Sequence, residues 1–447
     1  MVEAAKHRVP PAARILPGSI FYGWYIAVAC ALLMLVGVGV GYYGLPVFLG
    51  ALEDKHGWSN TQVSVAPAIY FTVSGLTAVV VGPMIDRRGP LGFMTVGMVL
   101  NGVSATFIGL VNQLWLLYLV YFVFAVAFGM SAGVAVNAIM TRWFVRRRAL
   151  AMSVSSTGVS LGGVILAPVA SRLIDVGGLE LATPVLGGLV LVVGLPVVLG
   201  VIVFDPAHMN LPPDGDPTPI TPNTTPAAAN QYRTWKRKEA MRTVGFWAIF
   251  IAFLLVLVAQ TGYIIHQVSF LEDRLGSRSE AAFTLSVTAL GSILARLVVG
   301  IFADGIDKRL LTFGLFVVQA TAILLIVYID NVLSTWVLTL IFGFTIGNVY
   351  MMQSLLVGEI FGMLSFGSIF GLISMAGQVG SGLGPIGVGF LHDQTDGYTI
   401  PFTVTAAVTY AAALAILFAR PSRAPNPEDS SETGARTMAT VSVDAGS

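Results

Sequence analysis

One arginine lies inside an otherwise apolar stretch, and its chemistry is the clearest in this chain. Residues 291–309 read GSILARLVVGIFADGIDKR, and Arg296 comes eight residues before Asp304. At 1.5 Å per residue, Arg296 would lie about 12 Å below the surface of a bilayer core about 30 Å thick. A guanidinium keeps its charge there and needs a polar partner. We predict that Arg296 binds an anion. The alternative is a structural arginine bonded to backbone carbonyls or to a helix end.

The composition shows what kind of protein must position this arginine. The chain has 447 residues, of which 55% are hydrophobic and 11% charged, and a mean hydropathy of +0.82. Soluble domains carry about 25% charged residues, so these values indicate an integral membrane protein. The single cysteine, Cys30, excludes a disulfide within the chain. No P-loop or HExxH motif is present, so we expect no cofactor, no metal and no ATP-driven step.

Twelve apolar segments are long enough to span a membrane. They lie near residues 22–49, 61–85, 90–111, 114–140, 149–174, 181–204, 243–270, 280–303, 310–329, 333–357, 364–391 and 398–419. A proline-rich and then basic stretch separates the sixth from the seventh. We therefore predict an all-α membrane protein with twelve transmembrane helices in two six-helix halves. Its predicted parts are a tail (1–20), a first half (21–204), a linker (205–242), a second half (243–420) and a disordered tail (421–447).

The basic residues predict the orientation, because lysine and arginine favour cytoplasmic loops. If both termini are cytoplasmic, the outer loops hold only four of the 24 Lys and Arg residues, namely Lys55, Arg172, Arg274 and Arg278. The basic linker then fits a cytoplasmic loop, and we expect no nucleic-acid partner. The expected location is a cell membrane, in particular the bacterial inner membrane.

The two halves are related in sequence at a constant offset of 218 residues. Gly82 and Asp86 correspond to Gly300 and Asp304, Gly162 to Gly380, and Asp175 to Asp393. Internal duplication is typical of secondary transporters, whose substrate binds near mid-membrane between the halves.

The duplicated loop carries a motif. Residues 82–89 read GPMIDRRG, and residues 300–309 read GIFADGIDKR. Both resemble the loop motif of the major facilitator superfamily, where the motif holds the inner gate closed. A single copy could equally be a solvated turn with cytoplasmic charges. The resemblance implies that the gating residues are Asp86, Arg87, Arg88, Asp304, Lys308 and Arg309, and we expect Glu359 to join them.

Four further stretches carry a finer resemblance. They are FYGWY (21–25), RWFVRRRALAMSVSSTGVSLGG (142–163), IIHQVSFLEDRLG (264–276) and GEIFGMLSFGSIFGLISMAGQVGSGLGP (358–385). They are similar to the monocarboxylate porter branch, its bacterial members and the oxalate/formate exchangers in particular. The resemblance implies that Arg296 binds the substrate carboxylate, which suits a planar fork of donors.

The chain departs from that branch in three places. Ser292 stands where animal members carry Asp, and Val47 follows Pro46 where they carry Lys. Oxalate exchangers carry a second base in the eleventh helix, but residues 364–391 contain no Lys or Arg. One buried positive charge fits a monoanion better than a dianion.

In the superfamily, the first, fourth, seventh and tenth helices face the cavity. The polar residues there are candidates for substrate contact, although each could instead bond a neighbouring helix. Ser292 lies one turn from Arg296 and could bond the same ligand or its own backbone. His266, near the outer end, is a candidate proton relay or a plain interfacial histidine. The predicted substrate-binding residues are Arg296, Ser292, Tyr42, Tyr43, Asn137, Tyr263, Gln267 and Asn348.

We therefore predict a secondary transporter, not an enzyme. It would move a small organic monocarboxylate such as a lactate-, pyruvate- or formate-like acid by alternating access, as symport or exchange. Its partners would be this organic anion, the lipid bilayer and, for symport, protons. Two alternatives stay open: an exporter of larger amphipathic compounds in which Arg296 is structural, and a membrane sensor that transports nothing.

Overall fold

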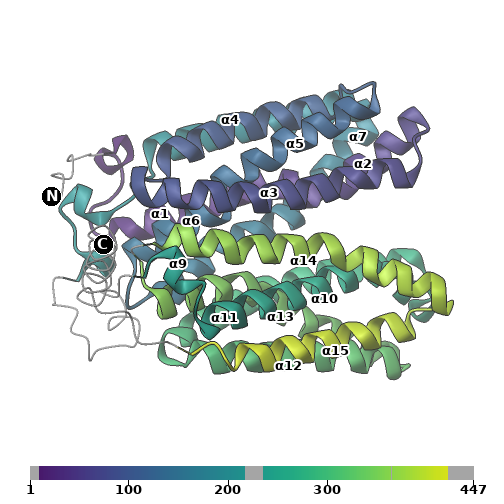
Figure 1. Ribbon diagram of the computed structural model, residues 1–447. Coiled ribbons are helices and arrows are strands. Elements are labelled where there is room, and N and C mark those ends of the chain that lie inside the picture. The colour runs from purple at the N-terminus through teal and green to yellow at the C-terminus, as the bar shows by residue number, and fades with distance from the viewer. Residues whose placement is uncertain (1–9, 217–234, 364, 421–447) are drawn as a thin grey trace, which may run out of the picture.

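The computed structural model describes residues 10–216, 235–363 and 365–420, and every regular element in these ranges is helical (Figure 1). The first bundle contains α1 (Tyr22–Val38), the π-helical turn η2 (Gly39–Tyr43), α2 (Gly44–His56), α3 (Asn60–Arg88), α4 (Leu91–Ile108), α5 (Leu114–Ser131), α6 (Gly133–Trp143) and α7 (Arg148–Gly200). The second contains α10 (Val244–Leu275), α11 (Arg278–Phe302), α12 (Lys308–Tyr328), α13 (Val332–Phe361), α14 (Phe366–Thr395) and α15 (Thr399–Ile416). Short helical turns lie outside the bundles: η1 (Pro11–Arg14), η3 (Pro206–Met209), η4 (Pro213–Gly215), α9 (Arg237–Ala240) and η5 (Ala303–Gly305).

The prediction of twelve spans is confirmed. Among the described residues, 11 helices are long and apolar enough to cross a membrane. One of them, the 53-residue α7, contains two spans because the backbone leaves the helical conformation at Gly177 and Gly178. Gly178 has φ of 69°, which glycine adopts without the clash that a Cβ atom would cause. The chain therefore turns back there with only these two residues.

Two spans consist of shorter pieces. The first is formed by α1, η2 and α2 and continues to His56, beyond the predicted end at residue 49. The fourth is formed by α5 and α6, which meet at Ala132. Glycines lie at both interruptions, and Pro46 follows the first, but our sequence analysis treated each segment as one continuous helix.

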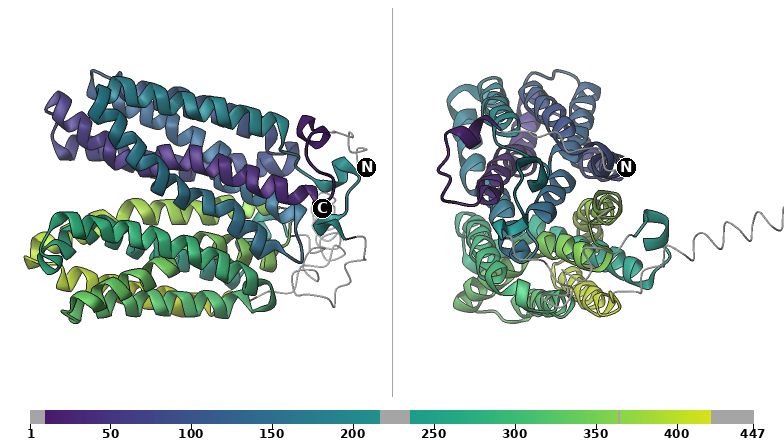
Figure 2. Two further views of the ribbon diagram at one scale, coloured as in Figure 1. Left: turned by 180° about the vertical axis from the view of Figure 1, so that it is seen from behind. Right: turned by 90° about the vertical axis from the view of Figure 1, so that its left-hand side faces the viewer.

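The two bundles lie side by side, with the first coloured purple to teal and the second green to yellow (Figures 1 and 2). Two pairs of helices make most of the contacts between them: α3 with α14, and α7 with α11. We call the end that holds Arg88, Arg148, Asp304 and Phe366 the basic end. A Cβ atom at Gly82 would overlap the carbonyl oxygen of Gly367 there. The absence of a side chain therefore lets the backbones of the two bundles touch.

Parts of the predicted organisation lie outside the described residues. These are the first nine residues, the middle of the linker (217–234) and the C-terminal tail (421–447).

Candidate substrate site and gate

Arg296 joins the two bundles from the last third of α11, six residues before this helix ends at Phe302. Its side chain is buried, with 3% of the residue exposed. Nε donates to the carbonyl oxygen of Gly347 in α13 at 2.6 Å, and Nη1 donates to the carbonyl oxygen of Ser156 in α7. Both acceptors are neutral carbonyl groups, as in the structural alternative considered above. One guanidinium therefore contacts both halves of the molecule.

Small residues bring these helices close enough for such contacts. A Cβ atom at Gly347 would overlap the carbonyl oxygen of Ser292, so α13 packs directly on α11. The Ser292 hydroxyl lies 3.1 Å from the Ser160 hydroxyl in α7. We call Arg296, Ser292, Gly347, Ser156 and Ser160 the polar seam. It brings together groups from α7, α11 and α13 and crosses from one half to the other.

The other predicted substrate residues are more scattered. The Gln267 amide donates to Thr284 Oγ1 at 2.9 Å, on the neighbouring α11. Asn348 lies next to Gly347 in the chain, and its amide donates to the carbonyl oxygen of Phe344 at 3.0 Å. Asn137 donates in the same way to the carbonyl four residues earlier, at 2.8 Å.

The tyrosine candidates do not join the polar seam. Tyr263 is fully buried between Phe342 and Phe402, inside the second bundle. Tyr42 and Tyr43 belong to the π-helical turn η2, and the structure does not describe their side chains.

The structure adds polar groups that the sequence analysis did not single out. Ser156 and Ser160 come from the serine-rich run of the fifth span, where several hydroxyls within an apolar helix were the available signal. Tyr70 and Tyr121 are buried, and neither hydroxyl has a hydrogen-bond partner among the described residues. A Cβ atom at Gly41, in η2, would lie 2.9 Å from the Tyr70 hydroxyl.

The first copy of the loop motif binds the opposite half at the basic end. Asp86, near the end of α3, accepts hydrogen bonds from the backbone N–H groups of Gly367 (2.8 Å) and Ser368 (2.7 Å) and from the Ser368 hydroxyl (2.6 Å). These residues begin α14, where unpaired N–H groups and the helix dipole favour a carboxylate.

The second copy makes the equivalent contact in reverse. The two carboxylate oxygens of Asp304 lie 3.0 and 3.2 Å from the backbone nitrogen of Ala149, at the start of α7. Ala149 and Gly367 are 218 residues apart, as are Asp86 and Asp304. The internal repeat therefore places both carboxylates on helix starts of the opposite half.

The remaining predicted gating residues surround these contacts. Lys308 Nζ donates to the Asp304 carbonyl at 3.2 Å and lies 3.6 Å from the Glu359 carboxylate. Arg309 pairs with Asp307 at 3.5 Å, whereas Arg87 and Arg88 are exposed. Arg148, which we did not predict, is buried, and its Nη2 lies 3.3 Å from Met363 Sδ of the other half.

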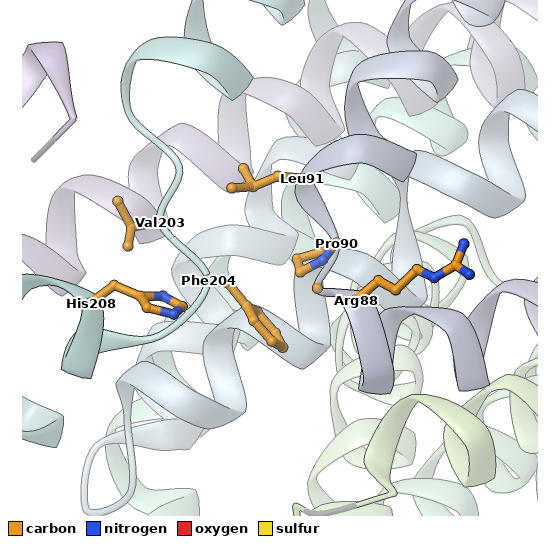
Figure 3. Close-up of a pocket in the computed structure, with 7 residues that line it drawn as sticks. Arg88, Pro90, Leu91, Val203, Phe204 and His208 are labelled. Atoms are coloured by element: carbon orange, nitrogen blue, oxygen red, sulfur yellow. The ribbon is translucent and has the colours of Figure 1, made fainter. Parts of the chain in front are cut away.

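Arg88 also borders a cavity of about 230 Å³ at the basic end, together with Phe204 and His208 (Figure 3). Its guanidinium points away from Phe204 in this view (Figure 3).

His266 lies in α10 near the opposite end and is half-buried. Its Nδ1 is 3.4 Å from the Tyr398 hydroxyl, and its Nε2 is 3.2 Å from the Pro385 carbonyl oxygen. A carbonyl can only accept, so the neutral ring that makes both contacts carries its hydrogen on Nε2. The described residues contain no group of three His, Cys, Asp or Glu side chains that could hold a metal ion.

The family model described as Major Facilitator Superfamily matches residues 30–385, and again 267–443. The chain belongs to this superfamily. The two half-bundles, joined by two carboxylate contacts at the basic end, have the fold of this superfamily. The protein is a membrane transporter rather than an enzyme.

Three relatives show which kinds of transporter the chain resembles. Monocarboxylate transporter 11 of Homo sapiens is 26% identical over 417 residues, which cover 86% of this chain and 81% of that protein. An MFS-type transporter of Gibberella moniliformis is 29% identical, and the match spans 39% of this chain and 40% of the fungal protein. The oxalate:formate antiporter of Oxalobacter formigenes is 27% identical over 39% of this chain and 41% of its own length. The relatives place the chain among secondary transporters.

Solved structures confirm the fold. The human organic anion transporter MFSD10 superposes with a TM-score of 0.68 at 14% identity, covering 88% of this chain and 99% of that one. The transporter FucP, crystallised in its outward conformation, gives 0.67 at 15% identity, covering 90% and 100%.

Proposed function

We propose that this protein transports a small organic monocarboxylate by alternating access, and that the substrate carboxylate binds Arg296. The observation that supports the proposal most is the position of Arg296, buried within an apolar span with contacts to both halves. A charge in such a place is usually functional. The named activity of the human monocarboxylate transporter relative supports the same substrate class.

On binding, the substrate carboxylate would replace a backbone carbonyl as a partner of Arg296, and this replacement would favour binding. A guanidinium bonds an ionised carboxylate more strongly than a neutral carbonyl, because the acceptor carries a full charge and can bind in a bidentate manner. A carboxylate entering the polar seam would take the position of the Ser156 carbonyl. The Ser160 and Ser292 hydroxyls, 3.1 Å apart, would then be within reach of a second polar atom of the substrate.

The charge balance favours a monoanion. Residues 364–391, which include most of α14, contain no Lys or Arg, so the seam offers a single base. The second carboxylate of an oxalate-like substrate would stay unpaired in a low-dielectric site. The name of the Oxalobacter relative includes both oxalate and formate. Of these two, the single base favours the formate-like acid.

We further propose that the basic end faces the cytoplasm of a bacterium and that residues 21–204 and 243–420 are the moving halves. Asp86 and Asp304 then hold the cytoplasmic side closed in this conformation. Symport and exchange both fit this arrangement, with His266 as the candidate proton relay for symport.

Uptake by proteoliposomes tests the proposal. Purified protein is first screened by thermal shift against formate, lactate, pyruvate, oxalate and malonate. The acid that stabilises it most is then supplied in labelled form to proteoliposomes and to protein-free vesicles. We expect a monocarboxylate to stabilise the protein and to accumulate or exchange. Stabilisation without flux would indicate a sensor. Flux of larger amphipathic compounds, with no response to any carboxylate, would indicate the exporter, for which the backbone partners of Arg296 are the supporting observation.

A further inference from the structure

The chain leaves α7 along the basic end of the first bundle. The Tyr22 hydroxyl donates to the carbonyl of Val201 at 2.9 Å, and the Trp143 indole donates to that of Val203 at 2.8 Å. Residues 204–216, which we call the strap, continue over this surface as far as the linker is described at this end. The aromatic motif at residues 21–25 contributes to this surface, because the Phe21 ring lies 5.7 Å from that of Trp143.

Three carboxylates attach the strap to the last turn of α6 and to the loop between α6 and α7. Asp205 pairs with Arg142 at 2.8 Å, and Asp216 pairs with Arg146. Asp214 accepts hydrogen bonds from three successive backbone nitrogens, those of Val145 (3.0 Å), Arg146 (2.9 Å) and Arg147 (3.3 Å). All three attachments are made within the first half.

The backbone of Asp214 supports a specific role for this residue. Its φ of 60° lies in the left-handed region, which is unfavourable for residues with a Cβ atom. Such a conformation persists where surrounding contacts impose it, and here the three hydrogen bonds from backbone N–H groups do so.

The strap touches both segments of the first half that carry gate contacts. Residues 145–147 lead directly into Ala149, whose N–H binds Asp304. On the other side, Phe204 and His208 border the cavity whose opposite wall includes Arg88 and Pro90 (Figure 3). These two residues follow Asp86 at the end of α3. The strap therefore connects the end of α3 with the start of α7.

The two helix starts differ in a way that explains the need for a strap. At the start of α14, Asp86 bonds the Ser368 hydroxyl as well as two N–H groups. The residue equivalent to Ser368 at the start of α7 is Leu150, which has no hydroxyl. The hydrogen bonds of Asp304 to the start of α7 consequently come from the backbone, which must already be ordered.

We propose that Asp214 is a positioning residue of the gate: it orders residues 145–147 so that the start of α7 can receive Asp304. The proposal concerns the empty protein and does not depend on the identity of the substrate. Without Asp214 the start of α7 frays. Fraying removes the Asp304 contact. Because this contact exists only while the basic end is closed, the closed state loses more stability than the open state.

Distance measurements between spin labels test this directly. In a Cys30→Ala background, labels are placed at Gly92→Cys in α4 and Gly314→Cys in α12, where a side chain meets no atom within 4 Å. Pulsed EPR on the ligand-free protein in liposomes then reports the separation of the halves. Asp214→Gly suits the left-handed backbone and removes the carboxylate. We expect its open-to-closed ratio to rise by about fivefold, the effect of losing a typical helix cap.

Two further variants sharpen the result. Asp216→Ala removes an ion pair from the same strap but leaves the amide contacts, so we expect the wild-type distribution. Asp214→Asn tolerates the left-handed backbone and keeps one acceptor oxygen, so we expect a smaller opening of about twofold. An unchanged distribution in both Asp214 variants, or a shift toward the closed state, would overturn the proposal. Because no ligand is used, this outcome is independent of whether the protein transports monocarboxylates.

Discussion

The pair α3–α14 and the pair α7–α11 join the same two halves, and the comparison between them separates gating from recognition. At the basic end the pairs are alike: Asp86 binds the start of α14, and Asp304 binds the start of α7. The offset of 218 residues relates the two carboxylates to each other, and it also relates the backbone N–H groups of Ala149 and Gly367 that donate to them. Gly82 and Gly300 each lack the side chain that would keep the helices apart. The contact of a carboxylate with a helix start is therefore made once in each direction between the halves.

Farther from the basic end the packing of the helices is still duplicated, but the buried charge is not. Ser292 corresponds to Ser74, Ser156 to Ser374 and Gly347 to Gly129. Gly129 faces the carbonyl of Ser74 as Gly347 faces that of Ser292. Arg296, however, corresponds to Ala78. The close packing is therefore a property of the repeat, whereas the proposed recognition of an anion rests on a single residue, Arg296, in one of the two helix pairs.

The largest expected effect comes from changing Arg296, the charge that the first half lacks at the equivalent position. Arg296→Lys should lower the initial rate of substrate uptake by about 100-fold, because an ammonium cannot replace the planar fork of donors. The matched control is Ala78→Ser at the equivalent position, whose uptake should stay within about twofold of wild type because no charge changes there. Rates in proteoliposomes are normalised to inserted protein. Near-normal uptake by a well-inserted Lys variant would mean that Arg296 is structural.

The second prediction compares the two gate carboxylates. Asp86→Asn and Asp304→Asn should each raise the open-to-closed ratio at the basic end, because a neutral amide interacts more weakly with a helix start. Asp86 also bonds a hydroxyl, so we expect about tenfold for Asp86→Asn and about threefold for Asp304→Asn. The labels at positions 92 and 314 measure both. A larger effect at Asp304 would reverse the comparison and show that the α7–α11 pair dominates closure.

The third prediction separates packing from recognition at two equivalent glycines. Gly347→Ala and Gly129→Ala should each destabilise the protein by about 1–3 kcal/mol, because the new methyl group meets backbone or side-chain atoms of the neighbouring helix. Only Gly347→Ala moves a carbonyl that Arg296 holds, so only this variant should raise KM, by several-fold. Thermal unfolding and uptake kinetics are measured side by side. An equal rise in KM for both variants would assign the effect to general loosening.

The smallest expected effect on exchange concerns His266, whose equivalent in the first half is Phe48. His266→Gln preserves hydrogen bonding but cannot titrate near neutral pH. If His266 relays protons, accumulation driven by a pH gradient should be lost while exchange of labelled for unlabelled substrate stays unchanged. Exchange requires only reorientation of the loaded carrier. Unchanged accumulation would identify His266 as an interfacial residue bonded to Tyr398 and Pro385.

The sequence was sufficient for the architecture because each span needs about 20 apolar residues and each reversal needs polar or glycine residues. On this basis the all-α fold class and a break between residues 174 and 181 were predicted, and the break lies at Gly177 and Gly178. The superfamily was indicated by the resemblance of the two loop motifs. The contact of each motif carboxylate with a helix start was not predicted in detail, since it joins residues more than 150 positions apart.

The orientation of individual side chains was harder to predict. A membrane helix is apolar on all sides, so its pattern does not show which face meets lipid and which meets protein. Tyr263 illustrates this: its place in the seventh span suggested a cavity residue, but it packs between two phenylalanines. The partners of Arg296 could not be predicted either, because backbone carbonyls leave no trace in the sequence.

Equilibrium binding tests the central proposal most directly, because it isolates recognition from gating and coupling. The dissociation constant of the monocarboxylate found in the thermal-shift screen is measured by calorimetry for wild type, Arg296→Gln and Ala78→Ser. We expect Arg296→Gln to weaken binding by at least about 30-fold, the loss of a charged and bidentate contact, and Ala78→Ser to leave it unchanged. An unchanged dissociation constant for a folded Arg296→Gln protein would contradict the assignment of the substrate carboxylate to Arg296.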